Sequence, residues 1–199
     1  MNILNKILRF ANDYDCEEIL SIYSYYVENT AVSFEIEVPT SKAFKERIVD
    51  INQKYPYLVV CVDGKIVGYT YASRHFTRAA YEYDVDVSIY VHSDYHGKKI
   101  AKALYLCLFD ILKEQGFYNI YASYTEPNEK SRKFHDKFDF KLVGTYYKTG
   151  FKLGKWHSVT WLEKNIREYD EKPKDIIYIR DLPSDIIDNI LYKYNKLWL

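Results

Sequence analysis

The sequence predicts a mixed α/β protein in which a mostly antiparallel central sheet is flanked by helices. Apolar runs typical of strands and segments of helical period follow one another in the order β-α-α-β-β-β-α-β-α-β-β, which is not a regular βαβ repeat. Asp63-Gly64 joins two of these runs and is the strongest hairpin signal in the chain. Within residues 83–91, apolar and polar side chains alternate, which is typical of a strand with two different faces.

Each element has its own local signal. The expected strands are residues 7–10, 57–62, 66–73, 83–91, 118–124, 141–148 and 156–162. Helix starts are expected at Asn12, Pro39-Thr40, Ile100 and Pro127-Asn128, and the helix that begins at Ile100 should end at Gly116. A loop that contains Gly150 and Gly154 is expected to join the last two strands.

The last 35 residues look like an addition to one domain. We expect a catalytic domain over residues 1–164 and an extension over 165–199, in which residues 165–172 are a charged linker and 176–179 a possible short strand. Ser184 is expected to cap a final helix. Its apolar stripe, which must be covered by the same domain or by a partner subunit, consists of Ile186, Ile187, Ile190, Leu191 and Tyr194.

The composition argues against two classes of partner. Lys plus Arg and Asp plus Glu both number 28 among 199 residues, so the basic surface that binds nucleic acid is not expected. No apolar run is long enough to cross a bilayer, and residues 1–10 do not resemble a signal peptide. Cys16, Cys61 and Cys107 are scattered and odd in number, which indicates reduced thiols and a cytoplasmic location.

Residues 89–104 run from a strand through a polar turn into a helix. Such a junction exposes free backbone N–H groups at the positive end of the helix dipole, which suits a pyrophosphate. Lys98, Lys99 and Lys102 add positive charge. From the residues alone, a solvated turn is an equally good interpretation, because lysines at a helix start oppose the dipole.

The junction resembles the acetyl-CoA-binding motif of the GNAT N-acetyltransferase superfamily. Further segments resemble, in order, its phosphinothricin acetyltransferase branch: residues 29–35, 55–59, 67–72, 87–92, 127–131, 134–135 and 150–157. The likeness extends over residues 7–164. It implies the acetyltransferase fold, acetyl-CoA as cosubstrate and no metal. It also implies a homodimer and a primary amine acceptor of the phosphinothricin or methionine sulfoximine type.

The resemblance also implies which residues bind the cofactor. They are Ile89, Tyr90, Val91, Gly97, Lys98, Lys99, Ile100, Ala101, Lys102, Asn128 and Ser131. Three positions depart from the family: His96 replaces Arg or Gln, and Lys99 and Asp139 each replace glycine. A left-handed Lys99 would cost about 1–2 kcal/mol. We therefore expect either an ordinary φ at Lys99 or an ammonium group that offsets the strain by meeting a phosphate.

The resemblance assigns the base to Asp86, where the family has Glu. Because Asp is one methylene shorter, we expect it to act through a water molecule. Asp84 lies about 7 Å away along the strand and, as a like charge, should raise the pKa of Asp86. Without the resemblance, the sequence favours a simpler interpretation, in which both carboxylates lie on a polar, solvent-exposed face of the strand. His135 matches the branch's histidine and is expected to protonate the thiolate or contact the substrate, with a structural role as the equal alternative.

Two of the expected substrate residues lie in the loop before residues 83–91. Arg74 and Arg78 could clamp an anionic oxygen, although both also fit ordinary surface arginines. The remaining expected contacts are Phe34, Glu35, Tyr81 and His157. The histidines have no spacing typical of a metal site. Two other functions stay open: acetylation of a different amine, and a degenerate acyl-CoA-binding module without turnover.

Overall fold

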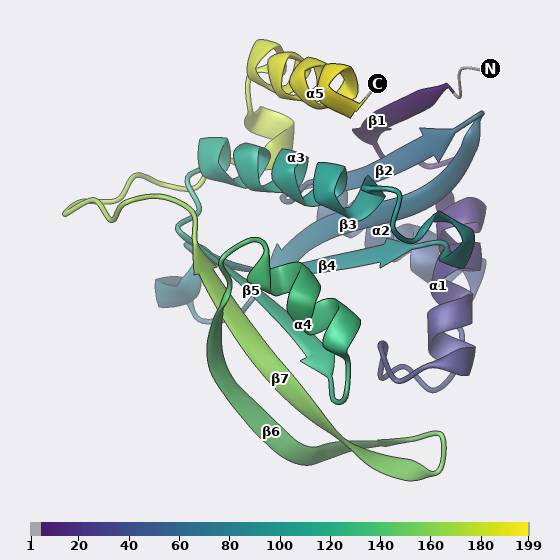
Figure 1. The fold of residues 1–199 in the computed structure, drawn as a ribbon. Coiled ribbons are helices and arrows are strands. Elements are labelled where there is room, and N and C mark those ends of the chain that lie inside the picture. Colours follow the sequence, from purple (N-terminus) through teal and green to yellow (C-terminus); the bar gives the residue numbers. More distant parts are fainter. Residues whose placement is uncertain (1–4, 199) are drawn as a thin grey trace.

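The computed structural model describes residues 5–198, and its centre is a seven-stranded sheet in the order β1-β2-β3-β4-β5-β7-β6 (Figure 1). The strands are β1 Lys6–Phe10, β2 Tyr57–Val62, β3 Lys65–Arg74, β4 Asp84–Val91, β5 Asn119–Thr125, β6 Lys141–Lys152 and β7 Lys155–Asn165. All neighbouring strands are antiparallel except β4 and β5, which are parallel. The fold class predicted from the sequence is confirmed.

Five α-helices accompany the sheet. They are α1 Cys16–Asn29, α2 Ser41–Asn52, α3 Ile100–Gln115, α4 Glu129–Asp136 and α5 Ser184–Trp198. As predicted, the Thr40 hydroxyl caps α2, the Asn128 side chain caps α4, and Gly116 ends α3 in the left-handed region with φ 102°. Within residues 5–198, no helix combines the length and apolar character needed to span a membrane.

Three local predictions were wrong. Asp15, not Asn12, precedes α1, because the Asn12 side chain accepts a hydrogen bond from the amide of Tyr14. Gly150 lies inside β6, so the β6–β7 connection is only Leu153-Gly154. Residues 176–179 form no strand: the Gln115 side chain donates to the Ile177 carbonyl, and this segment therefore bonds to the end of a helix.

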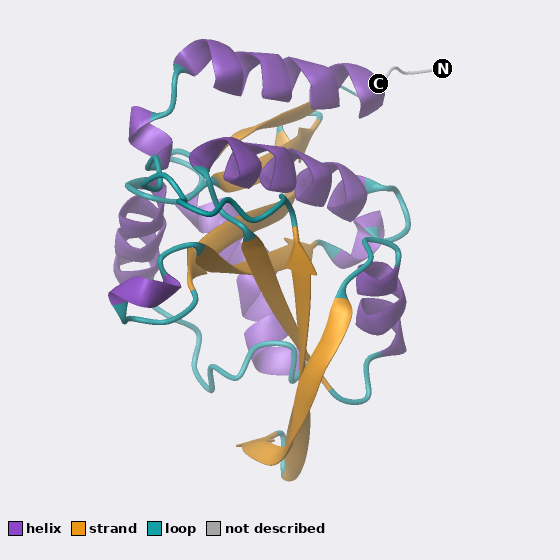
Figure 2. Ribbon diagram, turned by 90° about the vertical axis from the view of Figure 1, so that its left-hand side faces the viewer, coloured by secondary structure: helices purple, strands orange, loops and turns teal. Residues whose placement is uncertain are grey.

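The two faces of the sheet have separate cores. On one face α1 and α2 pack against aromatic side chains of β2, β3 and β4; on the other, α3 packs against aliphatic ones. Figure 2 shows helices on both sides of the sheet, with the helix that leads to the C-terminus outermost. Cys16, Cys61 and Cys107 are free and buried in these cores. Because successive side chains of a strand point to opposite faces, each β4 residue faces either the aromatic core under α1 and α2 or the aliphatic core under α3.

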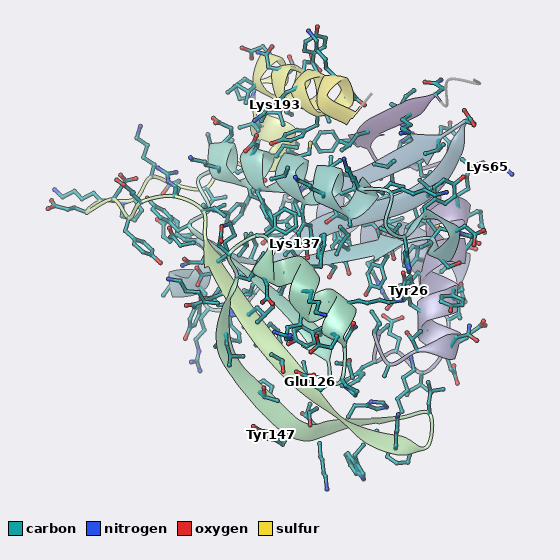
Figure 3. The ribbon with its side chains drawn as sticks, in the orientation of Figure 1. Tyr26, Lys65, Glu126, Lys137, Tyr147 and Lys193 are labelled. Carbon is teal, nitrogen blue, oxygen red and sulfur yellow. The ribbon has the colours of Figure 1, made fainter. Side chains whose placement is uncertain are left out.

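The extension packs on its own chain. The apolar side chains of α5 lie against α3, and Tyr194 is only 5% exposed. The Tyr194 hydroxyl and the Lys193 ammonium both donate to Asp110 of α3, at 2.6 and 2.7 Å (Figure 3). The Asn195 side chain donates to the Leu8 carbonyl and accepts from the Leu8 amide, so it bonds the edge strand β1 as a further strand would.

Candidate active site

β4 and β5 form a fork that opens towards the ends of both strands (Figure 1). They pair only where Asp84–Asp86 meets Asn119–Tyr121. Beyond that point β3 still pairs with β4 as far as Val91, and β7 still pairs with β5 as far as Thr125. Among residues 5–198 no other strand enters the fork. The predicted cofactor residues Ile89, Tyr90 and Val91 therefore lie on a strand edge that an extended ligand can reach.

α3 begins at the open end of β4 without a side-chain cap. Lys99 precedes the helix at φ 65° and ψ 5°, which excludes an ordinary φ, the first of the two alternatives. The first amide to bond back is that of Ala103, which donates to the Lys99 carbonyl. The N–H groups of Ile100, Ala101 and Lys102 precede it and point out of the helix end. This end of the helix has the donors and the dipole that an anionic group needs.

The turn before α3 is open to solvent on one side and hydrogen-bonded to the end of β4 on the other. Gly97 has φ 77°, and a Cβ atom there would have no atom within 4 Å, so the space beside the turn is open. His96 Nε2 lies 3.0 Å from the Val91 carbonyl oxygen, which can only accept, so this nitrogen carries the proton. The hydroxyl of Tyr26, labelled on α1 in Figure 3, donates to the same carbonyl. His96 thus fastens the turn to the end of β4.

Asp86 is the last β4 residue that pairs with β5, and it lies at the vertex of the fork. Burial raises its pKa, while a hydrogen bond from His75 partly opposes that rise. The direction of the shift is as predicted, but the cause is not Asp84. Asp84 instead accepts a hydrogen bond from the Asn119 side chain at 2.9 Å. A half-buried carboxylate with a raised pKa is a suitable proton acceptor.

His75 is a site residue that sequence reasoning missed. Its Nδ1 lies 2.7 Å from Asp86 Oδ1, and its ring stacks on Tyr121 with centroids 4.1 Å apart and planes at 6°. No local sequence pattern marks it, because the contact depends on the β3–β4 register, which places Ser73 opposite Asp86. Two residues later the chain leaves the sheet, where a side chain can turn back over that carboxylate.

His135 is buried in a cluster of aromatic side chains, and both its ring nitrogens have partners. Nδ1 lies 2.8 Å from the Ser131 carbonyl oxygen and Nε2 lies 3.2 Å from the Tyr105 hydroxyl. Burial lowers the pKa of His135, so the ring is neutral, donating from Nδ1 and accepting at Nε2. This environment favours the structural interpretation. Ser131 and the capping side chain of Asn128 bond to each other at the start of α4.

A cavity of about 350 Å³ opens on the same face of the sheet as Asp86. Its lining is uncharged and comprises Val32, Phe34, Ser123, Tyr124, Thr125, Tyr146, Thr149, Val159 and Trp161. Trp161 connects the cavity to the fork, because its ring lies edge-on to His75 with centroids 5.9 Å apart. Trp161 thus separates the cavity from the hydrogen-bonded pair of His75 and Asp86.

Two segments far apart in the sequence build the wall of this cavity. The ring of Phe34 lies against Gly150, where a Cβ atom would come within 2.2 Å of it. The buried Lys152 ammonium donates to the Ser33 carbonyl at 2.7 Å, and burial lowers its pKa. His157 bonds to the Lys152 carbonyl oxygen, so it supports the wall. Two of the predicted substrate residues, Phe34 and His157, are thus brought together, with ring centroids 6.2 Å apart.

Glu35 is paired, and the other predicted substrate residues are more distant. Arg47 donates to Glu35 at 2.7 Å. Arg74 pairs with Val85 across the strands, so it faces the α3 side, opposite Asp86. Arg78 is exposed in the loop after β3, while Tyr81 contacts Phe76 with ring centroids 4.9 Å apart. The structure therefore does not bring the two arginines together as a clamp beside Asp86.

Comparison with known proteins identifies the family. Residues 8–161 match the acetyltransferase (GNAT) domain. Phosphinothricin N-acetyltransferase of Streptomyces coelicolor is 32% identical over 154 residues, which cover 75% of this chain and 90% of that protein. L-methionine sulfoximine/L-methionine sulfone acetyltransferase of Salmonella typhimurium is 25% identical and covers 81% of this chain and 95% of its own.

A solved structure supports the same assignment. A GNAT phosphinothricin acetyltransferase from Sinorhizobium meliloti in complex with AcCoA is 31% identical, with a TM-score of 0.82 over 89% of this chain and 97% of that one. The chain therefore belongs to the acetyltransferase (GNAT) family. It is an acetyl-CoA-dependent acetyltransferase, as the resemblance implied.

Proposed function

We propose that this enzyme acetylates the primary amine of a small amino-acid analogue of the phosphinothricin or methionine sulfoximine type. The observation that carries the proposal is the uncharged cavity, because its lining residue Trp161 contacts His75, the hydrogen-bond partner of Asp86. The cofactor approaches along the open strand edges and the amine from the cavity. The activities of the relatives from Streptomyces coelicolor and Salmonella typhimurium support this choice of acceptor.

The residues fit the cofactor at the start of α3. The N–H groups of Ile100, Ala101 and Lys102 would hold the pyrophosphate, and the open space beside Gly97 leaves room for it. Lys99 and Lys102 are exposed and supply positive charge at this end of the helix. Acetyl-CoA supplies the acyl carbonyl and the thiolate leaving group when bound.

Asp86 is the proposed base. Its shorter side chain would take one proton of the ammonium group through a water molecule, which would free the nitrogen lone pair for the acyl carbon. As the thioester C–S bond breaks, a second proton from the nitrogen would neutralise the departing thiolate. The raised pKa of Asp86 brings it closer to that of an effective base near neutral pH. His135, with both nitrogens bonded, holds α4 in place and so positions Asn128 and Ser131 at the fork.

The residues that line the cavity limit which acceptor molecules it can bind. Of its nine lining side chains, none is charged. A second anionic group on the acceptor would lose its hydration there without a paired cation. We therefore favour a neutral sulfoximine or sulfone side chain over the phosphinate of phosphinothricin. Comparing kcat/KM for methionine sulfone and phosphinothricin tests this, and a preference for the phosphinate would contradict it.

A thiol-release assay with acetyl-CoA and a panel of amines tests the activity. Asp86→Asn should lower turnover by about a hundredfold or more, the scale of a general base. Asp84→Asn is the matched control, because Asp84 lies on the same strand but bonds to Asn119. Unchanged turnover in Asp86→Asn would remove the base assignment. Acetyl-CoA binding without thiol release for any amine would favour the non-catalytic module.

Homodimer formation and a cytoplasmic location complete the proposal. Exposed apolar side chains gather on the β6–β7 hairpin, among them Tyr147, which is 82% exposed and labelled in Figure 3. A second copy would cover such a surface. Sedimentation equilibrium should give twice the chain mass, and a monomer would contradict the dimer. The three free, buried cysteines suit a reducing compartment, which fractionation of the source cells would test.

A further inference from the structure

His75 and Asp86 form a hydrogen-bonded pair at the vertex of the fork. The Nδ1–Oδ1 distance is 2.7 Å. The Asp86 side chain is 28% exposed and that of His75 only 8%, so Asp86 is the member of the pair that solvent reaches more easily. The imidazole is enclosed by Tyr121, Trp161 and Phe76. An enclosed ring with one fixed partner is suited to holding that partner in place.

The chemistry of the pair sets the direction of the hydrogen bond. An ionised carboxylate can only accept, so Nδ1 of His75 must donate whenever Asp86 is ready to take a proton. One oxygen of Asp86 is then occupied, and the other remains for the water that meets the amine. A free Asp side chain in a polar site would sample several rotamers. The bond from His75 selects one of them.

We propose that His75 is a positioning residue for the base, acting through Asp86, so that a short carboxylate keeps a single orientation towards the amine. This inference rests on the proposed function, in which Asp86 is the base. The Asp86 side chain is shorter than that of Glu, so it can act as the base only if its orientation is fixed, and the hydrogen bond from His75 fixes it. His75 itself does not touch the reacting atoms.

The other groups around His75 leave the hydrogen bond as its main electrostatic contact. Tyr121 of β5 stays protonated, since burial, with Asp84 and Glu163 nearby, raises its pKa to about 12. Trp161 of β7 and Phe76 carry no charge. Asp86 is therefore the titrating group that His75 meets directly, and removing the bond should change the protonation of Asp86.

Two substitutions separate hydrogen bonding from packing. His75→Phe keeps an aromatic ring against Tyr121 and removes the donor. His75→Asn keeps an N–H near the position of Nδ1 and removes the stacking. We expect His75→Phe to lower kcat by about tenfold to a hundredfold, with KM for acetyl-CoA unchanged. The acidic limb of the kcat–pH profile of His75→Phe should move to higher pH by about one unit, because the hydrogen bond that favours the Asp86 carboxylate anion is gone. His75→Asn should keep the parent profile.

Two further measurements make the outcome decisive. Adding His75→Phe to Asp86→Asn should lower kcat little further, because a residue that acts through Asp86 has no carboxylate left to position. NMR titration of the Asp86 carboxyl carbon needs no turnover, so it tests the contact even if no amine is acetylated. We expect a higher Asp86 pKa in His75→Phe than in the parent. An unchanged Asp86 pKa, or a parent-like His75→Phe beside an impaired His75→Asn, would overturn the proposal without affecting the assignment of Asp86.

Discussion

Lys99 occupies a backbone conformation that its side chain disfavours, and this allows strain and charge to be separated. At φ 65° it lies in the left-handed region, which costs a residue with a Cβ atom about 1–2 kcal/mol. Replacing it with glycine relieves that strain but adds about 0.4–1 kcal/mol of entropy to the unfolded chain. The net expectation for Lys99→Gly is a gain in unfolding free energy of between about 0 and about 1.6 kcal/mol.

Thermal unfolding without cofactor measures this difference. For a chain of this length, 1 kcal/mol corresponds to a Tm change of roughly 2–4 °C. Lys99→Ala keeps the strain and should leave Tm near that of the parent. Gly97→Ala is the opposite control: at φ 77° with no atom within 4 Å of the added Cβ, it introduces strain without a clash and should lower Tm. A Lys99→Gly protein no more stable than Lys99→Ala would refute the reasoning about strain.

The same variants test whether the ammonium group meets a phosphate. If it does, Lys99→Ala should bind acetyl-CoA more weakly than the parent, and added salt should narrow the gap. Lys99→Gly should lose less affinity, because it relieves strain as it removes the charge. Calorimetric titration at low and high salt measures both effects. Equal affinity of all three proteins at low salt would show that Lys99 is only a solvent-facing residue of the turn.

Three further predictions concern the cavity wall, the C-terminal extension and the stability of the fold at low pH. Gly150→Ala should displace the Phe34 ring, because its Cβ would lie 2.2 Å from that ring, and kcat/KM for the amine should fall while the KM for acetyl-CoA holds; an unchanged kcat/KM for the amine would contradict this. A chain that ends at Lys164 should aggregate or unfold at lower temperature, since it exposes the face of α3 that α5 covers; equal stability and activity would show that the extension is dispensable. Burial alone would raise the pKa of Asp15, but the hydrogen bond from Arg9 prevails and lowers it. That stabilisation is present above the unfolded-state pKa of about 4 and is lost as pH falls through the folded-state pKa. Asp15→Asn should therefore flatten the acid limb of the stability curve, and an unaltered limb would exclude the ion pair as its cause.

The strand alternation of residues 83–91 already fixed which side of β4 Asp86 faces. Asp63-Gly64 likewise predicted a tight hairpin, and both residues have positive φ, 50° and 82°. These features are local: they depend on side-chain period or on one or two backbone angles, which neighbouring residues determine. The sequence could therefore predict the sheet, most helix boundaries and the turn before α3.

Only the tertiary structure decided the partners of the catalytic candidates. His75 meets Asp86 because of the β3–β4 register and the path of a loop, and His135 is enclosed by aromatic side chains from separate elements. Phe34 and Gly150 are more than a hundred residues apart, yet their contact shapes the cavity wall. Such contacts depend on how whole elements pack, and local pattern carries no information about which residue fills a given gap.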